Sequence, residues 1–110
     1  MGRYEYLLDE NEKLLKMFKA HLSKRGVSGG IVNGHISNIE LLINDYLAGD
    51  ERRSPEKADK YHIEGFLNWC IDKWIFNRVS GLISAMSSIR IFYEYLKEKG
   101  VMQKSIKGIL

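Results

Sequence analysis

The sequence predicts an all-α protein that folds as a single domain over residues 1–110. Apolar side chains recur every three or four positions, which is the period of amphipathic helices, and the β-branched residues follow this spacing instead of alternating as in a strand. The only proline, Pro55, lies in a charged stretch between two such patterns. With 45% hydrophobic residues, the chain can bury one core but has no room for a catalytic domain beside a recognition domain.

The first two helices are expected over residues 4–25 and 29–48. Gly26 is a stop signal for the first helix, Ser28 is a candidate N-cap of the second, and Gly49 follows the second. The stripe of the first helix consists of Leu8, Asn11, Leu15, Phe18, Leu22 and Arg25. The stripe of the second consists of Val32, His35, Ile36, Ile39, Leu42, Ile43, Tyr46 and Leu47. Each stripe indicates a helix with one buried face.

A charged loop, residues 50–60, leads into a third helix expected over residues 57–75, for which Asp59 is a candidate N-cap. The stripe of this helix consists of Ile63, Phe66, Leu67, Cys70, Ile71, Trp74 and Ile75. The fourth helix, residues 77–99, is apolar on nearly every side, and small side chains in its first half allow another backbone to come close. The tail, residues 101–110, mixes two lysines with apolar residues, which suggests that it packs on this domain or on something absent.

No group of residues has the spacing of a catalytic or metal site. The three histidines have no His, Cys or acidic partner at metal-ligand intervals, so we expect no metal and no cofactor. His35 lies in an apolar stripe, where a packed histidine is the simpler interpretation, and Cys70 is best interpreted as a small buried hydrophobe. The single cysteine and the lack of a signal peptide or membrane span favour a cytoplasmic protein without a membrane partner.

The charges are unevenly distributed along the chain. Seventeen basic and 14 acidic side chains give a formal net charge of +3. Residues 28–50 carry −3, whereas residues 1–27 carry +2 and residues 77–110 carry +4. The basic residues of the first and fourth helices are suited to contact phosphate groups. The competing interpretation is a solvated face of lysines, and from charge alone it is the stronger one.

The order in which four short sequence runs follow one another along the chain also bears on its fold and function. The runs that carry this order are Phe18 to Leu22 with Gly26-Val27-Ser28, then Ile31 to Leu47, then Asp59-Lys-Tyr-His-Ile63-Glu-Gly-Phe66-Leu67, and finally Ser87-Ser-Ile-Arg90-Ile-Phe92-Tyr93-Glu-Tyr95-Leu96. In this order the chain resembles the N-terminal SAM-like, or core-binding, domain of phage integrases and other tyrosine recombinases. The likeness covers nearly the whole chain, and the last run is its most specific part.

The resemblance implies an orthogonal four-helix, SAM-like bundle that forms one lobe of a clamp around duplex DNA beside a recombination site. The implied function is noncatalytic DNA binding in DNA integration or recombination. The catalytic lobe of the family carries an Arg, a His-x-x-Arg pair and a Tyr nucleophile; no His-x-x-Arg occurs here, so we expect no enzyme activity. The candidate DNA-binding residues are Lys24, Arg25, Ser28, His35, Arg78, Ser80, Ser84 and Arg90.

The expected partners are duplex DNA and, through the family, a C-terminal catalytic domain or other recombinase protomers, but no small-molecule substrate. An alternative function is a SAM-like protein-interaction or self-association domain that has lost the DNA surface. Two observations favour it: residues 28–50 are acidic, and Ile91 and Tyr95 lie opposite the core stripe of the fourth helix. Those two side chains would leave an apolar patch for a partner.

Overall fold

The computed structural model describes residues 2–101 and is all-helical over that range, which confirms the predicted fold class. The main helices are α1 (Arg3–Lys24), α2 (Gly29–Glu40), α3 (Lys60–Asp72) and α4 (Val79–Glu98). Helix α2 continues directly into η1 (Leu41–Ala48), which is π-helical, and one 3-10 turn, η2 (Pro55–Lys57), precedes α3. Apart from Val101, the predicted tail lies outside the described residues.

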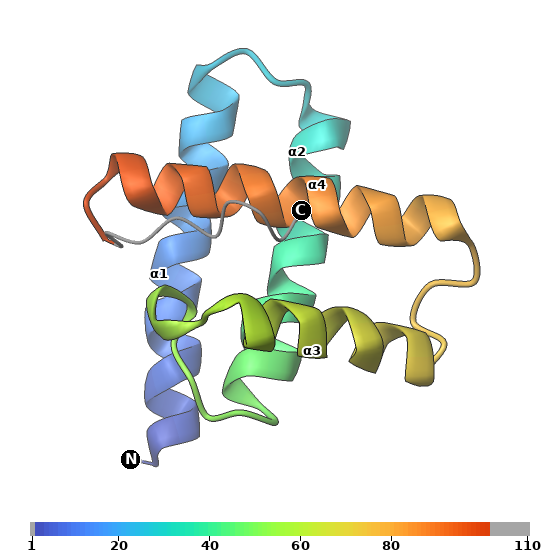
Figure 1. Ribbon diagram of the computed structural model, residues 1–110. Helices are drawn as coiled ribbons and strands as arrows, with labels where there is room; N and C mark the ends of the chain where they lie inside the picture. Colours follow the sequence, from blue (N-terminus) through green and yellow to red (C-terminus); the bar gives the residue numbers. More distant parts are fainter. Residues whose placement is uncertain (1, 102–110) are drawn as a thin grey trace.

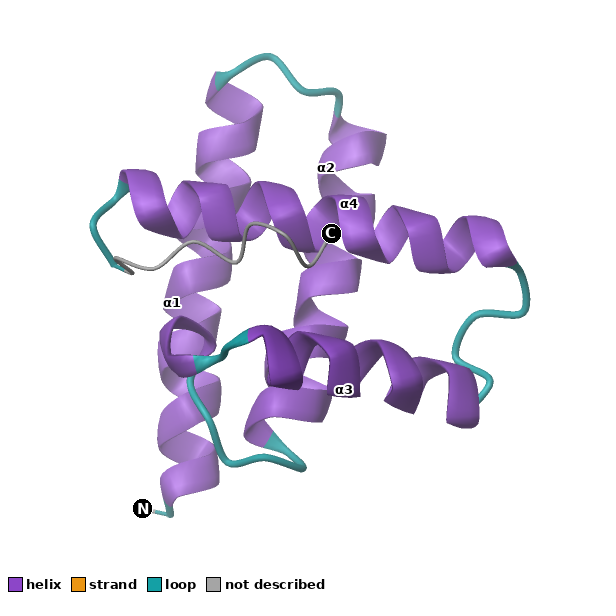
Figure 2. Cartoon of the chain, in the orientation of Figure 1, coloured by secondary structure: helices purple, strands orange, loops and turns teal. Residues whose placement is uncertain are grey.

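The helices cross at steep angles instead of running parallel. Helix α1 and the continuous α2–η1 rod lie side by side and run in opposite directions, and α4 crosses both of them (Figure 1). Helix α3 lies below α4 in the same view and packs on η1. Helices account for most of the described chain, with short loops between them (Figure 2). The result is an orthogonal four-helix bundle.

One core joins all of these elements. Its largest buried side chains come from different helices, and the rings of Phe18 and Phe92 meet edge to face at 5.2 Å between centroids. Two polar residues, Asn11 and Ser88, are buried with them. The Asn11 amide donates to the Ile43 carbonyl (3.0 Å) and to the Asn44 side chain (2.9 Å), which ties α1 to η1. No helix within residues 2–101 has the length and apolar character needed to cross a bilayer.

The start of α3 confirms the predicted cap. The Asp59 carboxylate accepts hydrogen bonds from the backbone N–H groups of Tyr61 and His62, while the His62 ring accepts one from the N–H of Asp59. This reciprocal pair is a capping box, which satisfies N–H groups that the first turn of a helix leaves without partners. Ser28 also occupies an N-cap position, at α2, but its side chain makes no capping hydrogen bond.

Two expectations about the third and fourth helices are wrong. Helix α3 is shorter than residues 57–75, because Ala58 and Asp59 are extended and because the chain turns at Trp74 (φ 55°). Trp74 and Ile75 therefore leave the predicted buried stripe and are exposed. Tyr95, expected in an exposed patch with Ile91, is only 2% exposed, since it packs against Phe18. Ile91 is partly buried against the same core.

Candidate nucleic-acid interface

Helices α2 and α4 meet through small and polar side chains. The His35 ring nitrogen Nδ1 lies 2.7 Å from the Ser88 hydroxyl, and the Asn38 amide donates to Ser88 Oγ (2.9 Å) and to Ser84 Oγ (3.2 Å). The Ser88 hydroxyl also lies 3.1 Å from the Ser84 carbonyl, to which it donates. The small side chains of Ser84, Ala85 and Ser88 thus let α2 come close to α4, as the sequence predicts for another backbone.

The hydrogen bonds of this cluster indicate that the His35 ring carries a proton on Nδ1. Because the single hydroxyl proton of Ser88 goes to the Ser84 carbonyl, Ser88 Oγ is left to accept from Asn38 and from Nδ1–H of His35. Burial lowers the pKa of His35 below its ordinary value, which favours the neutral ring. His35 is therefore a packed histidine with a satisfied ring nitrogen, as its place in the stripe indicates.

Charge is segregated between two halves of the molecule. We define the basic half as residues 13–39 and 73–93, which together contain eight basic and no acidic side chains. All eight are exposed: Lys13, Lys16, Lys19, Lys24, Arg25, Lys73, Arg78 and Arg90. The remaining described residues form the acidic half, with seven basic and all 14 acidic side chains. The segments of the basic half are contiguous in space, since α2 packs on both α1 and α4.

In Figure 1 the basic half comprises the upper end of α1, the first part of α2, the loop that follows α3 and most of α4, whereas the last turns of α4 belong to the acidic half. Lys13 and Lys16 pair with Glu10 and Glu12, one turn earlier in α1. The other six basic residues form no ion pair with the described part of the chain. Their charges therefore remain available to an anionic partner.

The three acidic residues of the segment 28–50 take no part in the hydrogen bonds at the α2–α4 crossing. Glu40 ends α2, Asp45 belongs to η1, and Asp50 follows it. The polar contacts to α4 come instead from His35 and Asn38, which precede all three acids in the chain. The net −3 of residues 28–50 thus belongs to the acidic half and does not neutralise the crossing.

The predicted DNA-binding residues fall into three groups. Lys24, Arg25 and Ser28 flank the turn between α1 and α2, and all three are exposed. Arg78 and Ser80 begin α4, and Arg90 is exposed farther along that helix. The remaining two predicted residues, His35 and Ser84, belong to the polar cluster at the crossing.

Sequence reasoning missed the two residues that hold the polar cluster together. Asn38 bonds to both serines, and Ser88 is fully buried beneath His35. Asn38 lies three positions after His35, so that both share one helix face, which is the signal that could have identified it. Ser88 is one of several serines in α4, and only the crossing of the two helices distinguishes it from the others.

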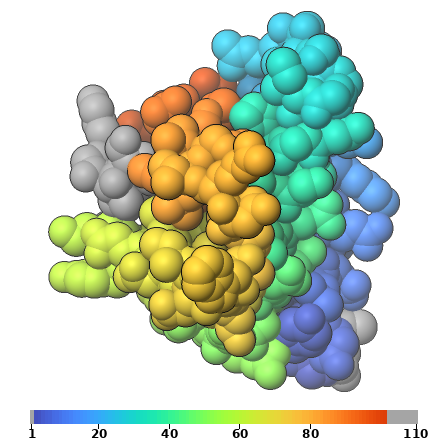
Figure 3. Space-filling model, turned by 90° about the vertical axis from the view of Figure 1, so that its right-hand side faces the viewer, coloured from blue at the N-terminus to red at the C-terminus, as the bar shows by residue number. Residues whose placement is uncertain are grey.

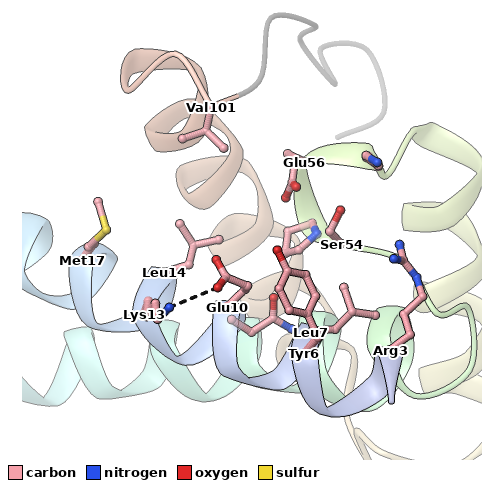
Figure 4. Close-up of a pocket in the computed structure, with 13 residues that line it drawn as sticks. Arg3, Tyr6, Leu7, Glu10, Lys13, Leu14, Met17, Ser54, Glu56 and Val101 are labelled. Carbon is pink, nitrogen blue, oxygen red and sulfur yellow. Dashed lines mark hydrogen bonds and ion pairs between the residues drawn. The ribbon is translucent and has the colours of Figure 1, made fainter. Parts of the chain in front are cut away.

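A second surface feature is a groove of about 520 Å³ between α1 and the η2 turn. Figure 4 shows its lining, with Tyr6 beside Ser54, with Leu14 and Met17 farther along α1, and with Glu10 paired to Lys13. None of the predicted DNA-binding residues lines it. Within residues 2–101, no three His, Cys, Asp or Glu side chains are grouped closely enough to hold a metal ion.

Two buried ionisable groups, Cys70 and Tyr93, are unsuited to nucleophilic chemistry. Burial raises the pKa of Cys70 to about 11, so its thiol is neutral at physiological pH. Burial also raises the pKa of Tyr93, whose hydroxyl donates to the Pro55 carbonyl at 2.8 Å. Tyr93 therefore connects α4 to the η2 turn and does not face solvent.

No protein-family model, curated protein or solved structure matches the chain. The function is therefore inferred from the geometry and charge of the residues themselves.

Proposed function

We propose that this chain is a noncatalytic DNA-binding domain whose basic half contacts the phosphate backbone of duplex DNA. The observation that carries the proposal is the segregation of charge: eight exposed basic residues and no acidic residue occur in the packed segments 13–39 and 73–93. A solvated lysine face needs no such exclusion of acids, because lysines interspersed with carboxylates are equally soluble. An anionic polymer, in contrast, is repelled by every carboxylate in its path.

Different residues of the basic half have different roles in this proposal. Arg78 and Arg90 on α4, together with Lys24 and Arg25 at the α1–α2 turn, supply charge to phosphates. The hydroxyls of Ser28 and Ser80 are exposed and add uncharged hydrogen bonds to the backbone. His35 has its Nδ1 engaged with Ser88, so its main role is to hold α2 against α4. Ser84 receives an amide from Asn38 and is still exposed to solvent.

The resemblance to tyrosine recombinases makes the proposal more specific. In that family the SAM-like domain clamps DNA beside the recombination site, and a separate lobe cleaves the strands. The orthogonal arrangement of four helices and the joint surface of α2 and α4 are compatible with such a clamp. A C-terminal catalytic domain or further recombinase protomers are then the protein partners, and the cytoplasm is the location.

Fluorescence anisotropy with a labelled duplex tests the proposal. At low salt we expect binding at micromolar protein. From two to five phosphate contacts, the slope of log affinity against log salt is expected to be about −2 to −4.5, at about 0.9 for each contact. Absence of binding at high micromolar protein, or an affinity that does not respond to salt, would contradict the proposal.

A pair of matched variants locates the surface. Arg90→Ala removes an exposed charge from the basic half, whereas Lys60→Ala removes one from the first turn of α3 in the acidic half. We expect Arg90→Ala to weaken binding several-fold and to make the salt slope shallower by about 0.9. Lys60→Ala should leave both quantities unchanged. Equal losses from the two variants would show that binding is not confined to the basic half.

A further inference from the structure

Three helices of this protein end in the same backbone motif, but one of them does so with an unusual residue. After α1, α3 and α4 the chain turns through a positive φ at Gly26 (82°), Trp74 (55°) and Gly100 (72°). In α3 the N–H of Ile75 donates to the Cys70 carbonyl (3.0 Å) and that of Trp74 to the Ile71 carbonyl (3.2 Å). Equivalent pairs close α1 and α4, and this pattern is the Schellman motif.

The left-handed position of this motif favours glycine, because a side chain there crowds the backbone. For a bulky residue the same conformation is an outlier. Packing within the domain does not compensate at Trp74, since the side chain is 83% exposed. Local folding therefore favours glycine at this position, as at the ends of α1 and α4. A strained residue retained at the surface points to a role outside the fold.

Trp74 is the centre of an exposed apolar surface, which we call the α3–α4 corner. Its members are Ile71, Trp74, Ile75, Val79 and Ile83. Val79 and Ile83 are 72% and 60% exposed, and a groove of about 340 Å³ lies between the end of α3 and the start of α4. Figure 3 faces this side of the molecule, with the yellow end of α3 below the orange start of α4. Of the corner residues, Ile71, Trp74 and Val79 line this groove, together with Cys70, Phe76 and Leu82.

The rim of the groove carries basic charge. Arg78 lines the groove, Lys73 directly precedes Trp74 in the chain, and both are exposed. Asp72 is the one acidic residue next to them in the chain, and none follows until Glu94. A mainly apolar groove with a basic rim complements a ligand that has an apolar face and acidic flanks.

We propose that the α3–α4 corner is a docking site for an acidic amphipathic helix of a partner protein, with Trp74 as its anchor. A helix placed in a groove presents apolar residues along one face, and tryptophan is prominent among the residues that dominate such interfaces. The four exposed aliphatic side chains favour a protein over a nucleic acid, because they offer no group to a phosphate. A two-fold contact of the corner with itself would bring Lys73 and Arg78 of two copies together.

A display library of helix-forming peptides, about 15 residues long, tests this proposal on the whole chain. We expect the selected peptides to carry apolar residues at three-four spacing and Asp or Glu on the flanks. Trp74→Gly should weaken their binding about tenfold or more. Because glycine fits the left-handed position, the melting temperature of this variant should equal or exceed that of the wild type. The matched control is Tyr61→Ala, which removes another exposed aromatic ring and should leave peptide binding unchanged.

Charge reversal provides an independent test of the partner chemistry. With Lys73→Glu combined with Arg78→Glu, the same library should yield peptides with basic flanks. The proposal is overturned if no selected peptide depends on Trp74, or if the flanks selected by the wild type are not acidic. It is also overturned if Trp74→Gly abolishes self-association in sedimentation, or if it lowers the affinity for DNA. Since Trp74→Gly is expected to retain DNA binding, this inference and the proposed DNA-binding function can fail separately.

Discussion

At the scale of single residues, the fold depends on a few buried polar groups whose partners are distant in the sequence. Ser88 is fully buried, and it bonds to His35, 53 positions away, and to Asn38, 50 positions away. Removal of one partner from a buried hydrogen bond leaves the other without compensation, which is more costly than removal of an exposed one. Such residues combine a role in stability with a role in placing α2 relative to α4.

Ser88→Ala tests the importance of this cluster. The variant leaves the Asn38 amide and the His35 ring without their shared acceptor, so we expect a loss of about 1–3 kcal/mol in the free energy of unfolding. Urea unfolding followed by circular dichroism measures it. The control is Ser87→Ala at the adjacent, partly exposed position, with an expected change below about 0.5 kcal/mol. If the two variants unfold alike, the cluster contributes little.

His35 predicts how stability depends on pH. Burial lowers its pKa in the folded protein below the ordinary value of 6.5, so protons bind more readily to the unfolded chain. The contribution of His35 to stability is therefore complete above about pH 6.5 and declines as the pH falls through the lower pKa of the folded state. In thermal unfolding from pH 7.5 to 5.5, His35→Gln should lose less stability than the wild type. Parallel declines would contradict this role.

At the scale of elements, the sequence pattern locates helices better than it locates their ends. Helix α1 and helix α4 lie within two residues of the predicted bounds, and the α2–η1 rod covers residues 29–48 as expected. The π-helical geometry of η1 was not predicted, because wider turns keep nearly the same apolar side chains on the buried face. The end of α3 was misplaced because Trp74 and Ile75 continue the apolar spacing after the backbone has turned.

The two N-caps provide a prediction at this scale. Asp59 makes a capping box at α3, whereas Ser28 makes no side-chain capping bond at α2. We expect Asp59→Ala to lower the midpoint of thermal unfolding by several degrees, because two N–H groups lose their acceptor. Ser28→Ala should change it little. A scan of both variants by differential scanning fluorimetry separates them, and a reversed order would be inconsistent with the capping geometry.

At the scale of the whole molecule, packing joins two segments that carry basic but no acidic side chains. The formal net charge of the chain is only +3, but the basic half has eight basic and no acidic side chains. The net charge of residues 28–50 does not reveal this division, because all three acidic residues of that segment lie at or after Glu40 and none precedes it. Only the packing of α2 against α1 and α4 joins the basic segments into one half. The proposed DNA surface and the proposed helix-docking corner share α4, where the corner occupies its first turns.

The sequence by itself determined the helical class, the single core, the cap at Asp59 and the stop at Gly26. These properties depend on spacing and on neighbours within one turn, which a linear chain contains. The tertiary structure decided the rest of the candidate site: that His35, Asn38, Ser84 and Ser88 share one cluster, that Tyr95 is buried, and that Trp74 is exposed. Contacts across more than 40 positions depend on how helices cross, and local periodicity carries no information about that crossing.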